Sequence, residues 1–273
     1  MTAGVVETGT VLDRILARTV ADLATRRATT PLTDLERGIA ARPAPVSLRD
    51  ALLRNPPAVI AEIKRASPSR GVFPVAVDPA TVAGEYLAGG AAALSILTDN
   101  PFFHGSLADL AAGAAVAHDR ARPAPVLRKD FVLDAYQIAE ARAFGADAVL
   151  LIAAALDDAT LAGLLSAAAG YGLDALVEVH DEAEMARAAA AGATLIGINN
   201  RDLRTFAVDL ATTERVAPLA PEGALLVGES GIFDGADVAR LVAVGVGAVL
   251  VGESLILAGD RAAAVRALRG VAR

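Results

Sequence analysis

The 273-residue sequence contains no cysteine and no tryptophan, and only 4% of its residues are aromatic. The absence of cysteine excludes disulfide-stabilised scaffolds, iron–sulfur clusters, cysteine-ligated zinc and any thiol nucleophile. Histidine is scarce too, with three residues and no HxH or HExxH spacing. Because metal sites usually show such spacings, we expect no bound metal.

Long hydrophobic runs and an excess of positive charge are also missing. Although 54% of the residues are hydrophobic, the longest apolar run, Leu241 to Gly252, is shorter than the about 18 residues of a membrane-spanning helix. The first ten residues lack the basic start and apolar block of a secretory signal. The net charge of −7 argues against general binding to nucleic acid or anionic membranes. We therefore expect a cytoplasmic protein that binds neither, in which a local cationic pocket is still allowed.

From residue 58 onward, the chain repeats one unit: a short strand-like run, a turn and a longer alanine-rich stretch with helical spacing. Eight units predict an α/β fold, the (β/α)8 TIM barrel, which takes about 250 residues. An open doubly wound sheet is the alternative, but no GxGxxG motif follows the first run. The eight strand-like runs are Ala58 to Lys64, Ala92 to Thr98, Ala124 to Asp130, Asp147 to Ala153, Asp174 to His180, Thr194 to Asn200, Ala224 to Ser230 and Gly247 to Glu253.

The first 57 residues do not belong to this repeat. Val11 to Arg27 carries apolar residues at helical spacing and predicts an amphipathic helix, followed by a shorter helical segment through Ile39. We predict an N-terminal helical extension over residues 1–50 and a barrel over residues 51–273. The sequence leaves open whether this extension caps one end of the barrel or helps to cover the mouth of an active site.

Charged and polar residues gather where the predicted strands end. In barrels of this type, catalytic groups lie at the C-terminal ends of the strands, where alternate side chains point inward. Two lysines and three glutamates would meet in one cavity of low dielectric, which shifts pKa values and prepares groups for proton transfer. Structural ion pairs explain any single pair equally well, but they explain the whole set less well. The residues at this level are Glu62, Lys64, Lys129, Glu178, Asn199 and Glu229.

Glycine turns follow the seventh and eighth strands, at Gly231 and Gly252, and each precedes an expected helix. Backbone N–H groups at such turns bind phosphate, and barrels often place a phosphate site after these two strands. Ordinary turn glycines are the better explanation of either one alone. The two together favour a phosphorylated small-molecule substrate.

The loops after the strands carry further candidates. The first loop, Ser67 to Pro79, is longer than the about 2 to 6 residues usual for its class, so it is either a lid or a plain surface loop. Phe103 and Phe131 either pack in the core or clamp a flat aromatic ring. His180 is interpreted as a strand-end residue rather than a catalyst.

Seven fragments resemble the indole-3-glycerol phosphate synthase family. They are AEIKRASPSRG (Ala61 to Gly71), SILTDNPFFHGS (Ser95 to Ser106), LRKDF (Leu127 to Phe131), LVEVH (Leu176 to His180), IGINNRDL (Ile196 to Leu203), VGESGI (Val227 to Ile232) and VGESL (Val251 to Leu255). The resemblance spans nearly the whole chain, and its E-x-K-x-x-S-P-S element is specific to the family. It implies a monomeric carboxy-lyase of tryptophan biosynthesis that needs no cofactor. Its substrate would be 1-(2-carboxyphenylamino)-1-deoxyribulose 5-phosphate, which closes to indole-3-glycerol phosphate with loss of carbon dioxide and water.

The resemblance also implies roles for single residues. Lys129 resembles the general acid that protonates the substrate carbonyl oxygen, and Glu178 resembles the acid/base of ring closure or dehydration. Lys64 resembles the lysine that contacts anionic groups of the substrate and acts in dehydration. The remaining implied positions are the supporting residues Glu62, Asn199 and Glu229, the phosphate-binding residues Lys64, Ser230, Gly231, Gly252 and Ser254, and the substrate-contacting residues Ser67, Arg201, Phe103 and Phe131.

Two departures from the family pattern are found, and other functions stay open. His104 and the Asn100-Pro101 turn lie in a loop that varies in the family. Glu253 replaces a more usual neutral residue beside the phosphate turn, and its carboxylate must point away from a phosphate. The related phosphoribosylanthranilate isomerases use a cysteine/aspartate pair, which this chain cannot supply. A Schiff-base aldolase using Lys129 or Lys64, a non-catalytic barrel with only a phosphate site, and a paralogue recruited to a specialised pathway are further alternatives.

Overall fold

A computed structural model describes residues 4–270 of the chain. Eight parallel strands close into a barrel in the order β1-β10-β9-β8-β7-β6-β5-β4. β1 pairs with both β4 and β10, so the predicted (β/α)8 barrel is confirmed and the open-sheet alternative is wrong. The strands are β1 (Ala58–Ile63), β4 (Ala93–Leu97), β5 (Val126–Lys129), β6 (Ala148–Ile152), β7 (Asp174–Val179), β8 (Leu195–Asn199), β9 (Leu225–Glu229) and β10 (Ala248–Val251).

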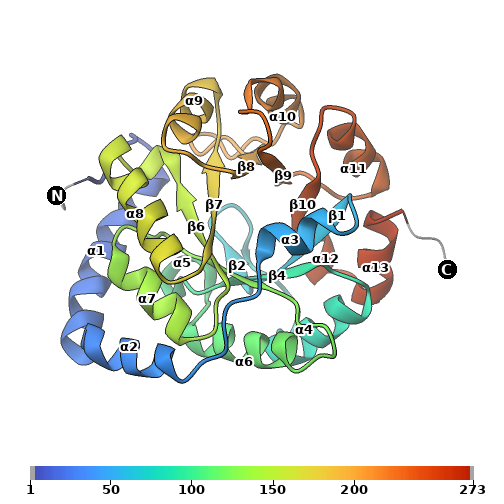
Figure 1. Ribbon diagram of the computed structural model, residues 1–273. Helices are drawn as coiled ribbons and strands as arrows, with labels where there is room; N and C mark the ends of the chain where they lie inside the picture. Colours follow the sequence, from blue (N-terminus) through green and yellow to red (C-terminus); the bar gives the residue numbers. More distant parts are fainter. Residues whose placement is uncertain (1–3, 271–273) are drawn as a thin grey trace.

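Helices form a ring around the strands (Figure 1). Aspartates start many of them: the side chains of Asp78, Asp157 and Asp181 accept hydrogen bonds from backbone N–H groups of the first turn. The ring contains α4 (Pro79–Ala88), α6 (Leu107–His118), α7 (Ala135–Ala143), α8 (Asp158–Gly170), α9 (Glu182–Ala190), α10 (Ala211–Val216), α11 (Gly235–Val242) and α13 (Arg261–Leu268). Shorter elements in the loops are β2 (Ala66–Ser67), β3 (Gly71–Val72), α5 (Asn100–Phe103), α12 (Glu253–Ile256) and the 3-10 turns η1 (Ala153–Ala155) and η2 (Ala217–Leu219).

The barrel interior is apolar along the strands and charged at their C-terminal ends. In parallel strands, residues in register point to the same face. Glu178 is in register with Gly197, and Glu229 with Asn199, so these residues share the inner face. The residues two positions earlier on β5, β7 and β9 are fully buried and apolar: Leu127, Leu176 and Val227. This packed layer supports the charged residues at the strand ends.

A short helix, α3 (Leu48–Leu53), lies at the opposite end of the barrel. The Oγ of Ser47 and the backbone N–H of Arg49 both donate to Asp174 Oδ2, at 3.1 and 3.0 Å, and Asp174 begins β7. The predicted boundary between residues 50 and 51 falls inside this helix.

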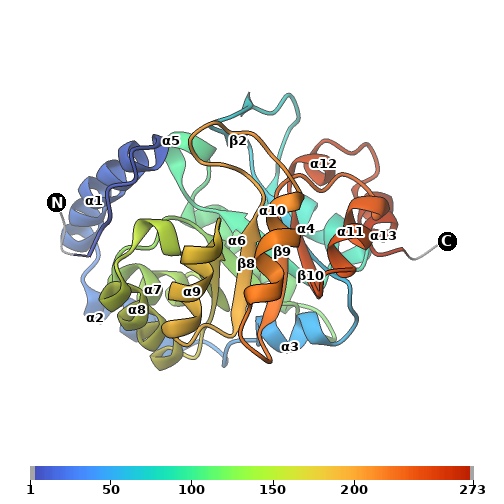
Figure 2. The ribbon, with the colours of Figure 1, turned by 90° about the horizontal axis from the view of Figure 1, so that it is seen from above.

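Two helices form most of the N-terminal extension, α1 (Val11–Thr29) and α2 (Leu32–Ala40). α1 runs along the flank of the barrel and reaches the end where α5 and β2 lie (Figure 2). Arg26 near its C-terminus binds Glu140 at 2.7 Å, and Glu140 also binds the fully buried Arg128 of β5 at 2.9 Å. Through the buried Glu140 and Arg128, this chain of ion pairs connects the extension to the strand that carries Lys129.

The structure bears on the expectations about membrane-spanning segments and about the two ends of the chain. Within residues 4–270, no helix is both long and apolar enough to cross a membrane. Residues 1–3, which begin the predicted extension and the stretch searched for a secretory signal, lie outside the described residues, as do residues 271–273 at the end of the predicted barrel segment.

Candidate active site

A cavity of about 560 Å³ lies at the C-terminal ends of the strands. Its volume is within the range of about 300 to 1,000 Å³ that is typical of small-molecule sites. Its lining includes every predicted site residue except Ser254: Glu62, Lys64, Ser67, Phe103, Lys129, Phe131, Glu178, Asn199, Arg201, Glu229, Ser230, Gly231 and Gly252. Residues from distant parts of the chain that were predicted to lie at the C-terminal ends of the strands thus line one cavity.

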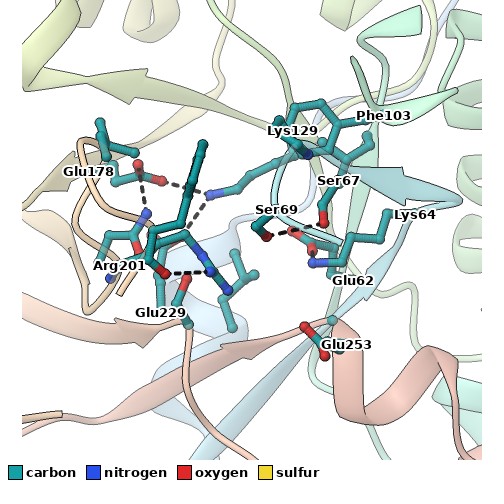
Figure 3. A pocket seen from close by; sticks show the side chains of 18 of the residues that line it. Glu62, Lys64, Ser67, Ser69, Phe103, Lys129, Glu178, Arg201, Glu229 and Glu253 are labelled. Carbon is teal, nitrogen blue, oxygen red and sulfur yellow. Dashed lines mark hydrogen bonds and ion pairs between the residues drawn. The ribbon is translucent and has the colours of Figure 1, made fainter. Parts of the chain in front are cut away.

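Lys129 is bound between two carboxylates (Figure 3). Its Nζ donates to Glu178 Oε2 at 2.8 Å and to Glu229 Oε2 at 2.7 Å. Burial by itself disfavours the ammonium, but the attraction of Glu178, Glu229 and Glu62 outweighs it and raises the pKa of Lys129. The side chain is 14% exposed. Lys129 is therefore a cation with a proton to donate, and it has access to the cavity.

Glu178 is held as a carboxylate. Its Oε1 accepts a hydrogen bond from Asn199 Nδ2 at 3.1 Å, and its Oε2 accepts from Lys129. Burial by itself would raise the pKa of Glu178, but Lys129 and His180 hold it well below the usual range. The ionised group can accept a proton at neutral pH.

The pKa of Glu229 is shifted in the opposite direction to that of Glu178. Burial, reinforced by the charges of Glu178 and Glu62, raises the pKa of Glu229 to about 7 despite the attraction of Lys129. Its Oε1 has no hydrogen-bond partner within the part of the chain that the structure describes. The pKa values of two neighbouring carboxyl groups are thus shifted in opposite directions, a pattern that is typical of sites with an acid and a base.

The position of Glu229 depends on a glycine. A Cβ added at Gly197 of β8 would overlap Glu229 Oε1. We expect Gly197→Ala to push this carboxylate off Lys129 and to lower kcat by about 10-fold, because small displacements of catalytic groups are costly. Steady-state kinetics and thermal unfolding check this result. Gly163→Ala in α8 is the control, since open space surrounds that helical glycine; equal kcat in the two variants would contradict the prediction.

A second ion pair lies at the end of β1. Lys64 Nζ is 2.8 Å from Glu62 Oε1 and 5.9 Å from the centre of the Phe73 ring. A Cβ at Gly252 would overlap Glu62 Oε1 and crowd Lys64 Nζ. The glycine therefore lets this pair approach the turn after β10.

The turns after β9 and β10 are joined to each other. Ser230 and Gly231 have positive φ values of 62° and 76°, a conformation that favours glycine. Ser254 Oγ donates to the carbonyl of Ile232 at 3.1 Å. Ser254 therefore ties the two turns together, and its hydroxyl is engaged outside the cavity lining.

Only one of the two turns leads directly into a helix. α12 starts at Glu253, immediately after Gly252, as expected. α11 starts at Gly235, four residues after Gly231, so the expectation for the first turn is wrong. The reason is a capping box: Asp234 and Asp237 satisfy each other's backbone N–H groups and fix the helix start there.

Apolar residues form the remaining wall of the cavity. The Phe103 and Phe131 rings lie 6.1 Å apart with a tilt of 40°, a common aromatic arrangement. Val11, Leu12 and Ile15 of α1 also line the cavity. The N-terminal extension thus contributes to the mouth of the site, which answers the question that its amphipathic pattern left open.

Sequence reasoning missed several contacts around the mouth. Arg70, in the loop after β1, binds Glu253 at 2.7 Å, which gives the carboxylate beside the turn after β10 a cationic partner. Leu203, Phe206 and Val208, in the loop after β8, also line the cavity. Nothing in the local spacing of these loop residues marks them, because their neighbours come from distant loops.

The chain is similar to known proteins in sequence and in fold. The family model described as indole-3-glycerol phosphate synthase matches residues 12–268. An indole-3-glycerol phosphate synthase of Roseiflexus sp. is 48% identical over 96% of this chain and 98% of its own length, and one of Nocardioides sp. is 50% identical with the same coverage. Among solved structures, a thiamine phosphate pyrophosphorylase from Pyrococcus furiosus superposes with a TM-score of 0.61 at 18% identity, covering 80% of this chain and 96% of that one. At that identity, the structural match shows the barrel fold alone.

Proposed function

The chain belongs to the indole-3-glycerol phosphate synthase family, and from this premise we propose how its residues carry out the reaction. It is a carboxy-lyase of tryptophan biosynthesis that closes 1-(2-carboxyphenylamino)-1-deoxyribulose 5-phosphate to indole-3-glycerol phosphate. The observation that carries the assignment of roles is the position of Lys129 between Glu178 and Glu229, inside a cavity lined by aromatic rings.

In the first step, the aromatic carbon that bears the carboxylate attacks the ribulose carbonyl. Lys129 donates a proton to the carbonyl oxygen as the new bond forms. Positive charge builds on the anthranilate part at the same time, and the Glu178 carboxylate stabilises it. Carbon dioxide then leaves, which restores the aromatic ring and gives an indoline that carries a hydroxyl group.

In the second step, that hydroxyl leaves as water. An acid must protonate the hydroxyl, and a base must take a proton from the neighbouring methylene carbon. We assign the acid to Lys64, which lies at the other side of the cavity beside Glu62, and the base to Glu178. Asn199 supports Glu178 with a hydrogen bond, and Glu229 supports Lys129. Because a carboxylate leaves as neutral carbon dioxide, each turnover takes up one proton from the solvent.

The phosphate is proposed to bind at the turns after β9 and β10. Lys64 and the backbone N–H groups of Ser230, Gly231 and Gly252 provide the donors, and Ser254 keeps the two turns together. Phe103 and Phe131 would enclose the anthranilate ring, while Ser67 and Arg201 would contact polar groups of the substrate.

Gly231→Ala tests the phosphate turn. Alanine is strained at a φ of 76°, and its Cβ would overlap Val208 Cγ1. We expect KM to rise about 10-fold while kcat changes little, with a matching loss of inhibition by inorganic phosphate, because the change alters ground-state binding of the phosphate. Gly259→Ala is the control, since nothing lies near that position. Unchanged phosphate inhibition in the Gly231 variant would place the phosphate elsewhere.

The overall reaction, closure of the substrate to an indole, can be tested directly. Purified protein is mixed with the carboxyphenylamino-deoxyribulose phosphate without added metal, and indole absorbance is followed. Appearance of the indole is the expected result, whereas no change in absorbance would favour a recruited paralogue or a non-catalytic barrel.

We further propose that the enzyme works as a cytoplasmic monomer without nucleic acid or membrane partners. It is built from an extension over residues 1–50 and a barrel over residues 51–273. Its net charge of −7 supports the absence of anionic partners. Light scattering checks the monomer.

A further inference from the structure

His180 lies directly behind Glu178, outside the cavity lining. It follows β7 by one residue, and its Nε2 is 3.3 Å from Glu178 Oε1. Its Nδ1 is 3.0 Å from Glu184 Oε2, so the imidazole stands between two carboxylates. The side chain is only 12% exposed. The proposed mechanism assigns no function to this buried titratable group.

The start of α9 fixes the imidazole. Glu184 Oε2 accepts the backbone N–H of His180 at 2.8 Å as well as its ring Nδ1. The N–H of Glu184 in turn donates to Asp181, the residue that caps α9. His180 is thus held at both its backbone and its ring by one carboxylate, and its second ring nitrogen is left facing Glu178.

The groups around His180 favour its charged form. Glu178 of β7 and Glu184 of α9 contact it, Asp202 of the loop after β8 interacts with it electrostatically, and Lys129 of β5 lies beyond Glu178. Burial by itself disfavours the imidazolium, but the two glutamates outweigh it and raise the pKa of His180 to about 10. The imidazole therefore carries a positive charge at neutral pH.

We propose that His180 is a positioning residue that keeps Glu178 ionised and correctly oriented after Lys129 has given up its proton. This inference rests on the proposed function. At rest, two cations flank Glu178, namely Lys129 and His180. When Lys129 protonates the carbonyl oxygen, the first positive charge is lost. The second stays, because His180 lies outside the cavity lining and is held there by Glu184. Glu178 consequently remains a base for the dehydration step.

His180→Gln tests the proposal, because glutamine keeps a hydrogen-bond donor and removes the charge. Without the cation, the pKa of Glu178 rises, so the acid limb of the kcat–pH profile moves to higher pH. We expect the acid limb to move by about one pH unit, so that kcat falls about 10-fold at a pH on that limb, while kcat near neutral pH and KM change little. An unmoved acid limb would overturn the proposal, even if kcat fell, since a purely structural role lowers activity without moving the limb.

Two further variants sharpen the test. Glu184→Gln keeps an acceptor for the His180 backbone and removes the charge that stabilises the imidazolium, so a smaller shift in the same direction is expected; it also serves if the His180 variant fails to fold. His118→Gln is the matched control, because His118 pairs with Asp147 at 2.8 Å near the opposite end of the barrel. The same limb shift in that control would overturn the proposal. Full activity of Glu178→Gln would instead refute the proposed function itself, so the two failures are distinguishable.

Discussion

Lys129→Ala is expected to lower kcat/KM by at least about 100-fold, the usual loss when a positioned general acid is removed. Lys129 is one of only two lysines in the chain, and both line the cavity. Lys64 is paired with Glu62, and His180 lies outside the cavity lining. Arginine supplies the remaining cationic side chains, and a guanidinium keeps its proton under all ordinary conditions and cannot act as a general acid. We therefore expect none of these cations to replace the proton of Lys129.

The same variant is expected to remain folded but to unfold at a lower temperature. Removing the ammonium leaves Glu178 and Glu229 close together without a shared cation. Loss of one partner of a buried ion pair is destabilising. Glu229 softens this effect because its pKa is already raised to about 7, so it can take up a proton and become neutral. Steady-state kinetics, circular dichroism and thermal unfolding check the two parts separately; near-normal turnover in a folded Lys129→Ala protein would refute the role of general acid.

Glu178→Gln is expected to reduce kcat by at least about 100-fold as well. The amide keeps the size of the carboxylate and one acceptor oxygen, but it has no negative charge and cannot accept a proton in the dehydration step. Rapid-quench measurement of a single turnover would show whether the indoline intermediate accumulates. Accumulation assigns Glu178 to dehydration, and its absence with equally slow turnover assigns the residue to ring closure.

A surface glutamate provides the control for this variant. Glu182 is also on the β7–α9 segment, but it is outside the cavity lining and pairs with Arg215 at 2.6 Å. Glu182→Gln should leave kcat and KM unchanged. If both glutamine variants behaved like the unchanged protein, Glu178 would not be the acid/base.

The barrel and its charged layer could be predicted because both follow from local periodicity. Eight apolar runs separated by helical stretches determine the strand count, and alternation along each strand places Glu62 with Lys64 on one face. The contacts around the rim could not be predicted in the same way. Arg70 of the loop after β1 contacts Glu253, the first residue of α12, and no local spacing around either residue predicts that contact.

The surroundings of His180 could not be predicted from the sequence for a different reason. A histidine at a strand end is most often a simple surface residue, and the LVEVH fragment alone does not show which carboxylates surround its ring. Only the start of α9, which brings Glu184 back onto the ring, reveals its paired environment. The position of α11 was similarly hidden, because a capping box at Asp234 competes with the glycine turn for the start of the helix.

The confinement of both lysines to the cavity also has a practical consequence. Reagents that acylate lysine side chains have only Lys64 and Lys129 to modify, and neither side chain is more than 17% exposed. Lysine modification followed by mass spectrometry would therefore report occupancy of the cavity, without background from other lysine side chains. Attachment of the enzyme to a solid support through lysine would, for the same reason, compete with turnover, whereas carboxylate-directed or arginine-directed coupling would have many exposed groups to use.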